Sequence, residues 1–224
     1  MAVVQRNRVA WTIALGTGAG LTLVAYGFAQ HPQASLLSVA AASAVLIAYG
    51  AIGFSLKRPR SSAVAVPAFV AGLCGGAVFA AEILLEYAYL PVDNVVWGYV
   101  EFGTVFAIYA LAAVWVAWRG GSIGDAVRAA FFSAIISSLI WCLILLSTFY
   151  AYEGTAAQTA VFIAEGEPQD FLKSGMSDYR TFLIEDMFGA TFFHLLLGPI
   201  IAGFLGLICS SSILTIRRLI GGKG

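Results

Sequence analysis

Six long apolar runs constrain this chain more than any other feature of its sequence. Each run holds about 20 residues or more, which is enough to cross a hydrocarbon layer about 30 Å thick. Only 11% of the residues are charged, whereas a soluble domain carries about 25%. The sequence therefore predicts an all-α integral membrane protein with six transmembrane helices, built as a single transmembrane helical domain over residues 1–224. The expected helices cover about 9–29, 36–56, 63–90, 95–118, 126–150 and 189–216.

Basic residues decide the expected orientation. In a six-span arrangement four basic clusters all fall on one side, and they are made of Arg6, Arg8, Lys57, Arg58, Arg60, Arg119, Arg128, Arg217, Arg218 and Lys223. Loops rich in Lys and Arg stay in the cytoplasm. We therefore expect both termini to be cytoplasmic, in a multi-pass protein of the plasma (inner) membrane.

One connection is much longer than the others and rich in acidic residues. It covers 153–188, between the fifth and sixth helices, and falls on the outer side of the predicted topology. We expect partial order, because Ser177 can cap a helix that continues toward Phe188. Apolar side chains before and after this cap suggest a short interfacial helix on the membrane surface, and they include Phe171, Leu172, Met176 and Tyr179.

Small residues and one proline mark special places inside the apolar helices. Gly72 and Gly76 have the spacing that allows two membrane helices to pack closely. Pro199 lies inside the sixth helix, where its ring clashes with the carbonyl of Leu195 and its missing N–H removes a backbone hydrogen bond. We expect this helix to bend there, with Gly198 easing the bend.

Ionisable side chains in membrane helices are costly and are therefore functional candidates. Eighteen residues separate Glu101 from Arg119 and 23 separate His194 from Arg217, which correspond to about 27 and 35 Å of helix. Glu82 lies about 33 Å from Arg60 on the same rise of 1.5 Å per residue. Glu82, Glu101 and His194 are thus expected at one depth, near the outer membrane boundary.

This shared depth predicts one outer-facing site, with Glu82, Glu101 and His194 in a pocket. Glu86 lies one turn beyond Glu82, at the expected mouth of the pocket, and Asp186 lies two turns beyond His194. Carboxylate oxygens and imidazole bind hard or borderline cations, so Glu82, Glu101 and His194 are also the candidate metal ligands. Clustered carboxylates can alternatively relay protons. Exposure of Glu86 to outer water, and a helix-to-helix hydrogen bond from His194, remain open as simpler explanations.

Three functional interpretations follow. The first is a protein that binds or translocates a cation or protons through the acidic cluster. The alternative is a non-catalytic subunit or scaffold of a larger membrane complex, with Phe171, Tyr179 and Phe182 on a surface for a membrane-protein partner or a second copy. An enzyme using His194 with a carboxylate as an acid–base pair is less favoured. The sequence gives no indication of a particular cofactor. The expected surroundings are the lipid bilayer, and the zero net charge gives no reason to expect a nucleic-acid partner.

Overall fold

The fold is all-helical, and six of its helices are long and apolar enough to cross a membrane. The computed structural model describes residues 2–55, 62–89 and 95–221, so Lys57, Arg58, Arg60, Asp93 and Lys223 lie outside the described residues. The six candidate spans are α1 (Ala2–Gln30), α2 (Leu36–Ser55), α3 (Ser62–Tyr89), α4 (Val95–Trp118), α5 (Ile123–Ala151) and α8 (Tyr179–Gly221). Two shorter helices, α6 (Ala156–Glu165) and α7 (Glu167–Ser174), lie between α5 and α8. This confirms the six apolar helices predicted from the sequence.

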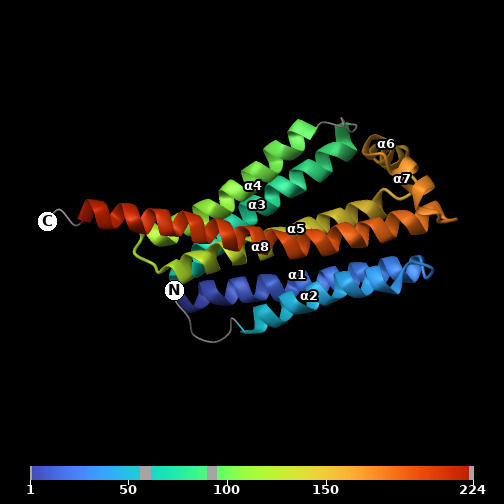
Figure 1. Ribbon diagram of the computed structural model, residues 1–224. Coiled ribbons are helices and arrows are strands. Elements are labelled where there is room, and N and C mark those ends of the chain that lie inside the picture. The colour runs from blue at the N-terminus through green and yellow to red at the C-terminus, as the bar shows by residue number, and fades with distance from the viewer. Residues whose placement is uncertain (1, 56–61, 90–94, 222–224) are drawn as a thin grey trace.

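The helices run roughly along one axis, and the two ends of the bundle differ in charge. Both termini lie toward the same end, while α6 and α7 lie at the other (Figure 1). At the end near the termini, Arg217 of α8 donates a hydrogen bond of 2.9 Å to the carbonyl of Ala117 in the last turn of α4. A cation there complements the negative end of the α4 dipole. Arg128 also lies at this end, paired with Asp125 at 3.2 Å.

Helix α5 is the centre of the bundle, because α1, α3, α4 and α8 all pack against it. The contact with α3 depends on two glycines. A Cβ atom added at Gly72 would lie 2.7 Å from Cβ of Ile136, and one at Gly76 would lie 2.8 Å from Cβ of Ile140. The predicted small-residue pair therefore does bring two helices into close contact. Figure 1 shows α3 and α4 diverging from α5 and α8 toward the end that carries α6 and α7.

Helix α8 has 43 residues and is therefore about 65 Å long, roughly twice the thickness of a hydrocarbon layer. It continues through Pro199 without interruption (Figure 1). The carbonyl of Leu195 would normally accept the N–H that proline lacks. The hydroxyl of Tyr49 in α2 donates a hydrogen bond to this carbonyl instead. A second helix thus satisfies the backbone group that Pro199 leaves free, while the predicted bend stays a prediction.

Replacing Tyr49 with phenylalanine should destabilise the protein measurably. The side chain is only 4% exposed, so the Tyr49→Phe variant leaves the carbonyl of Leu195 buried without its partner. An unsatisfied buried polar group costs about 1–3 kcal/mol. Thermal unfolding in mild detergent should show the loss, and Tyr99→Phe is the matched control because Tyr99 is 76% exposed. Equal unfolding midpoints for the two variants would contradict this role of Tyr49.

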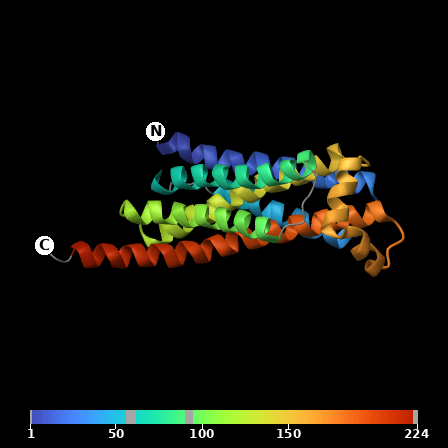
Figure 2. The same cartoon turned by 90° about the horizontal axis from the view of Figure 1, so that it is seen from above.

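The connection over residues 153–188 is more ordered than the sequence predicted. It contains α6, which the sequence analysis did not anticipate, then α7 and the first turns of α8. The predicted cap at Ser177 is wrong by one residue, because the side chain of Asp178 accepts the hydrogen bond from the N–H of Thr181 at 2.7 Å. Helix α6 lies across the end of the bundle (Figure 2). The charged connection therefore covers the helix ends.

Candidate functional site

Local sequence signals fix the position of α6. It begins at Thr155, whose side chain accepts a hydrogen bond of 3.2 Å from the N–H of Gln158. The side-chain amide of Gln158 in turn donates to the carbonyl of Phe149, at 2.9 Å, and so fastens α6 to the end of α5. The helix ends at Gly166, which has φ +87°. Because side chains rarely adopt this left-handed conformation, glycine allows the sharp turn into α7.

This turn contributes to a group of six carboxylates from five helices, which we call the acidic cluster. Each member interacts electrostatically with at least one other member. The cluster consists of Glu82 and Glu86 of α3, Glu101 of α4, Glu165 of α6, Glu167 of α7 and Asp186 of α8. Its members come from parts of the chain that lie far apart in sequence.

The inner part of the cluster lies where α3 and α4 face each other. Glu82 and Glu86 are separated by four residues, which places them on one face of α3. Their carboxyl groups are within hydrogen-bonding reach of each other. Two carboxyl groups can form such a bond only when one of them carries a proton, because an ionised carboxylate has no donor. Glu101 interacts with the charge of both. This part of the site can therefore hold a shared proton.

The outer part of the cluster flanks Gly166. Loss of surrounding water, followed by the charges of Glu86, Glu167 and Asp186, raises the pKa of Glu165 to about 8. Loss of water and the charges of Asp186 and Asp170 likewise raise the pKa of Glu167 to about 7. Glu165 nevertheless remains exposed at the surface, so water screens part of this repulsion. Both carboxyl groups thus keep their proton to higher pH than an ordinary glutamate does, while solvent can still reach Glu165.

The nearby cations pair with carboxylates outside the cluster. Lys173 contacts Asp170 at 2.7 Å, and Asp170 lies at the edge of the cluster, since its charge acts on Glu167 and Asp186. His31 and Arg180 both contact Glu153, at 3.6 and 3.8 Å. Within the described part of the chain, no ion pair joins a basic side chain to a member of the acidic cluster. The negative charge of the cluster is therefore left for protons or a bound cation to neutralise.

A three-ligand metal site is not formed by the predicted residues. Across residues 2–55, 62–89 and 95–221, no three His, Cys, Asp or Glu side chains form a group that could hold a metal ion. The electrostatic interactions of the acidic cluster do not involve His194. Glu82, Glu86 and Glu101 thus act on one another's charge, and Asp186 acts on Glu165 and Glu167. Glu82, Glu101 and His194 do not form a group of metal ligands among the described residues.

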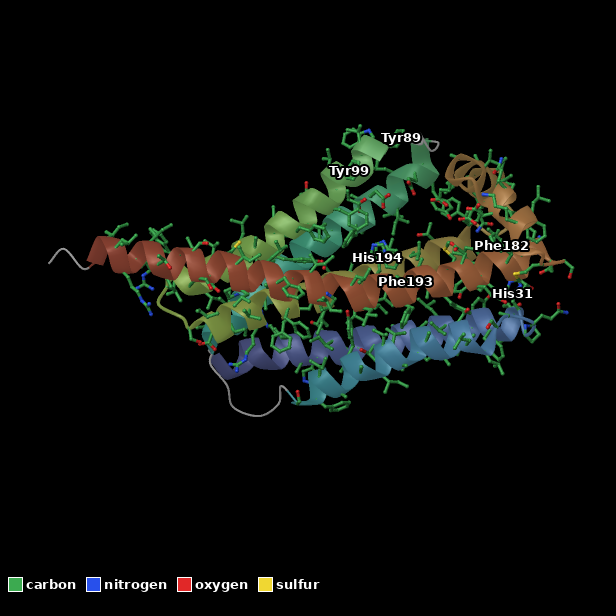
Figure 3. All side chains as sticks on the ribbon, viewed as in Figure 1. His31, Tyr89, Tyr99, Phe182, Phe193 and His194 are labelled. Atoms are coloured by element: carbon green, nitrogen blue, oxygen red, sulfur yellow. The ribbon has the colours of Figure 1, made fainter. Side chains whose placement is uncertain are left out.

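His194 lies in an aromatic environment instead. Its ring stacks on Trp141 of α5 with centroids 3.8 Å apart. Phe79 and Phe102 lie 5.8 and 5.5 Å away, centroid to centroid. Figure 3 shows His194 on α8 in the region where α3 and α4 diverge from α8. Phe79 lies one turn before Glu82, and Phe102 follows Glu101 in sequence, so these contacts place His194 near the level of both glutamates. The imidazole itself, however, faces aromatic rings.

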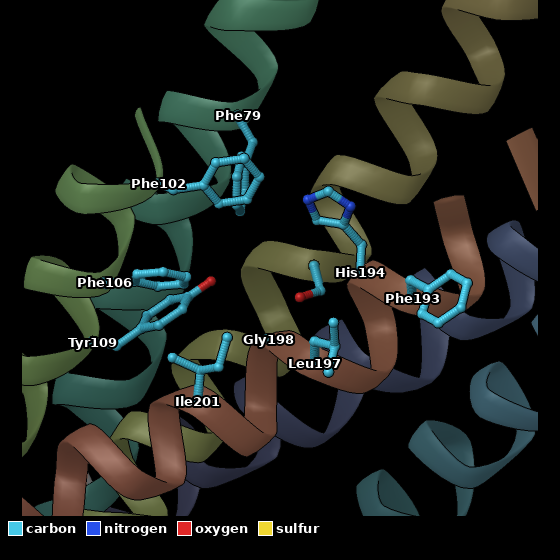
Figure 4. A pocket seen from close by; sticks show the side chains of 10 residues that line it. Phe79, Phe102, Phe106, Tyr109, Phe193, His194, Leu197, Gly198 and Ile201 are labelled. Carbon is cyan, nitrogen blue, oxygen red and sulfur yellow. The ribbon is translucent and has the colours of Figure 1, made fainter. Parts of the chain in front are cut away.

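A pocket of about 260 Å³ opens beside His194. It lies between α3, α4, α5 and α8, and Figure 4 shows His194, Phe79 and Phe102 together at one end of it. The buried Nε2 atom of His194 has no hydrogen-bond partner. Most buried polar atoms have partners, so an exception calls for an explanation. The pocket is therefore a second feature of interest, distinct from the acidic cluster.

Sequence reasoning missed Glu165 and Glu167 as members of the cluster. Their signal was present, because Thr155 is a favourable helix cap and Gly166 a favourable helix end. What the sequence could not indicate is that the turn at Gly166 places both carboxylates near Glu86. That proximity depends on the packing of α6 against α3.

The fold and site together define a class of protein, a multi-pass helical membrane bundle with an acidic cluster at one end. Comparison with protein-family models, with curated proteins and with solved structures finds no match to the chain.

Proposed function

We propose that this plasma-membrane protein binds or translocates protons, or a cation in their place, through the acidic cluster at its outer end. The observation that carries the proposal is a set of six carboxylates from five helices whose charges act on one another and which have no paired basic residue among those described. Gathering like charges is unfavourable unless protons or cations neutralise them. A fold that assembles such a cluster is well suited to taking up positive charge.

Protons are favoured over a coordinated metal ion. The described side chains form no group of three metal ligands, whereas the Glu82–Glu86 contact suits a shared proton. Buried hydroxyl groups of α5 could continue a path inward, since Ser133, Ser137 and Ser138 lie along its buried face. Tyr109 of α4 hydrogen-bonds with Ser137. These buried hydroxyls are the deeper polar groups that support translocation within this proposal.

Proton flux into liposomes tests this function. Purified protein would be reconstituted with a pH-sensitive dye inside the vesicles, and flux would be driven by a potassium diffusion potential. We expect wild-type flux above that of empty vesicles and a loss of about tenfold or more in Glu82→Gln. Glu153→Gln is the control, because Glu153 pairs with His31 and Arg180 outside the cluster. Infrared spectra of the same samples would report carboxyl protonation, and a wild type without flux or pH-dependent carboxyl signal would refute the proposal.

The alternative scaffold function depends on an exposed surface for a partner. Phe171, Tyr179 and Phe182 were its candidate contacts, yet they pack on one another with ring centroids 5.1 to 6.3 Å apart. Purification from native membranes in mild detergent separates the two functions. Stoichiometric co-purifying subunits would favour the scaffold, and a protein that purifies alone with proton flux would favour the acidic site.

The orientation is a separate prediction that cysteine labelling can check. In a cysteine-free background, Thr159→Cys on the exposed surface of α6 should react with a membrane-impermeant reagent added outside cells. Arg218→Cys, at the opposite end of the bundle, should react only after permeabilisation. Gln158 is unsuitable despite its neighbouring position, because it is buried. The reverse labelling pattern would place the acidic cluster on the cytoplasmic side.

A further inference from the structure

We propose that the pocket beside His194 binds a neutral membrane-soluble amphiphile with a flat, oxygen-bearing ring as its head, the chemical class of the prenylated quinones. The proposal does not depend on the function of the acidic cluster. It is based on the shape, the lining and the position of the pocket, and on one buried nitrogen atom without a partner.

The pocket opens sideways toward the lipid. On α8 its wall is formed by residues at positions 194, 197, 198 and 201, which share one helix face. At its rim, Phe193 is 59% exposed, whereas Tyr109 on the lining is 1% exposed. Tyr109 lies ten residues from Arg119, about 15 Å along α4, so the inner end of the pocket lies near the middle of the membrane and His194 lies at its outer end. A ligand can therefore enter from the hydrocarbon layer.

The lining selects a flat ring. Phe79, Phe102, Phe106 and Tyr109 present aromatic surfaces on one side, and Ile201 and Leu197 close the other (Figure 4). Aromatic side chains gain from offset or edge-to-face contacts with another ring. The volume of about 260 Å³ is slightly below the usual range for ligand pockets, about 300–1,000 Å³. It suits a ring head whose apolar tail remains in the lipid.

The unpartnered Nε2 atom of His194 selects an oxygen substituent on that ring. Nε2 is almost inaccessible behind the neighbouring rings, so a ligand oxygen reaches it only when one of these rings shifts. A purely hydrocarbon ligand would leave the atom without a hydrogen bond, and an unmade buried bond is costly. The stack on Trp141 holds the imidazole in place, and the Ser138 side chain adds a second polar group to the lining. A quinone oxygen accepts a hydrogen bond and a quinol hydroxyl can also donate one, so either tautomer of His194 is served.

Charged lipid heads fit this pocket poorly. None of its ten lining residues is Lys, Arg, Asp or Glu, and an unpaired phosphate or carboxylate in apolar surroundings pays a large desolvation cost. A neutral head with one or two hydrogen-bonding oxygens avoids that cost. This distinguishes the proposed ligand from phospholipids and fatty acids.

Nitrogen NMR on histidine-labelled protein tests the proposal with an internal control. The chain has two histidines, and His31 lies at the α1–α2 turn, away from the pocket (Figure 3). In phosphatidylcholine nanodiscs, decylubiquinone should shift the Nε2 resonance of His194 in a saturable way and leave that of His31 unchanged. Decylbenzene, which keeps the ring and the tail but lacks the oxygens, should not produce the shift. An equal shift with decylbenzene, or none with decylubiquinone, would overturn the proposal.

Variants separate pocket binding from partition into lipid. Tritiated decylubiquinone retained by protein-containing nanodiscs, corrected for empty nanodiscs, measures binding. Ile201→Trp should fill the pocket and abolish retention, whereas Leu207→Trp on the exposed, lipid-facing surface of α8 should retain it. His194→Phe keeps a ring but removes the nitrogen, and should weaken binding by about tenfold. Wild-type retention by Ile201→Trp or His194→Phe would show that the ligand binds elsewhere.

Discussion

Replacing Gly72 with alanine should lower the thermal unfolding midpoint of the protein by roughly 5 °C, although alanine is the better helix former. Helix propensity alone favours alanine over glycine by about 1 kcal/mol. At this position, however, the new Cβ would lie 2.7 Å from Cβ of Ile136 and 3.0 Å from the backbone oxygen of Ser133. Neither atom is the end of a flexible side chain, so α3 and α5 must move apart. Overpacking of this kind costs about 1–3 kcal/mol, and each kcal/mol shifts the midpoint by about 2–4 °C in a chain of this size.

Gly18→Ala provides the matched control with the opposite expected sign. Gly18 also lies inside a candidate membrane span, but an added Cβ there meets nothing within 4 Å. Its replacement should therefore leave the midpoint unchanged or raise it slightly through helix propensity. Both variants would be compared in the same detergent by loss of the monodisperse peak after heating. Similar midpoints for the two variants would mean that α3 and α5 do not pack closely at Gly72.

The membrane helices could be predicted from sequence because their signals are local. An apolar run of sufficient length defines a span, and polar residues interrupt these runs at the ends of α1, α4 and α5. The exact first residue was less certain. For example, α5 begins at Ile123, before the predicted start at Ala126, because Ser122 and Asp125 form a capping box. This cap is also a local signal, but it precedes the apolar run, so the run alone does not show where the helix begins.

The candidate site was only partly predictable, because the depth of a side chain along its helix and the direction in which it points depend on different interactions. Helical rise placed Glu82, Glu101 and His194 at one height. Their directions depend on how each helix is rotated, and packing against distant helices decides that rotation. For His194 the stack on Trp141 turns the ring toward the aromatic pocket. The hydroxyl that satisfies the carbonyl of Leu195 likewise comes from another helix, which no local pattern indicates.

The stability of the end that carries the acidic cluster should fall as pH rises. In the folded protein the pKa of Glu165 is raised from 4.5 to about 8, and that of Glu167 to about 7. Between pH 4.5 and about pH 8 the folded state binds more protons than the unfolded state. The free energy of unfolding therefore decreases as pH increases. The contribution of this proton binding to stability is fully present below about pH 4.5 and is lost as the pH passes through about 8. Thermal unfolding midpoints measured across this window should decline.

Glu165→Gln should flatten that decline, because the neutral amide cannot ionise among the other carboxylates. Four groups surround this position from three other helices, namely Glu82 and Glu86 of α3, Glu167 of α7 and Asp186 of α8. They continue to titrate, so the variant should reduce the pH dependence without removing it. Its midpoint should exceed that of the wild type mainly at the alkaline end of the window, where Glu165 would be ionised. Glu153→Gln changes a carboxylate that pairs with His31 and Arg180 and should keep the wild-type slope. A Glu165→Gln profile parallel to the wild type would mean that Glu165 carries no proton in the folded protein at neutral pH, which would remove the outer part of the acidic cluster from any proton-binding role.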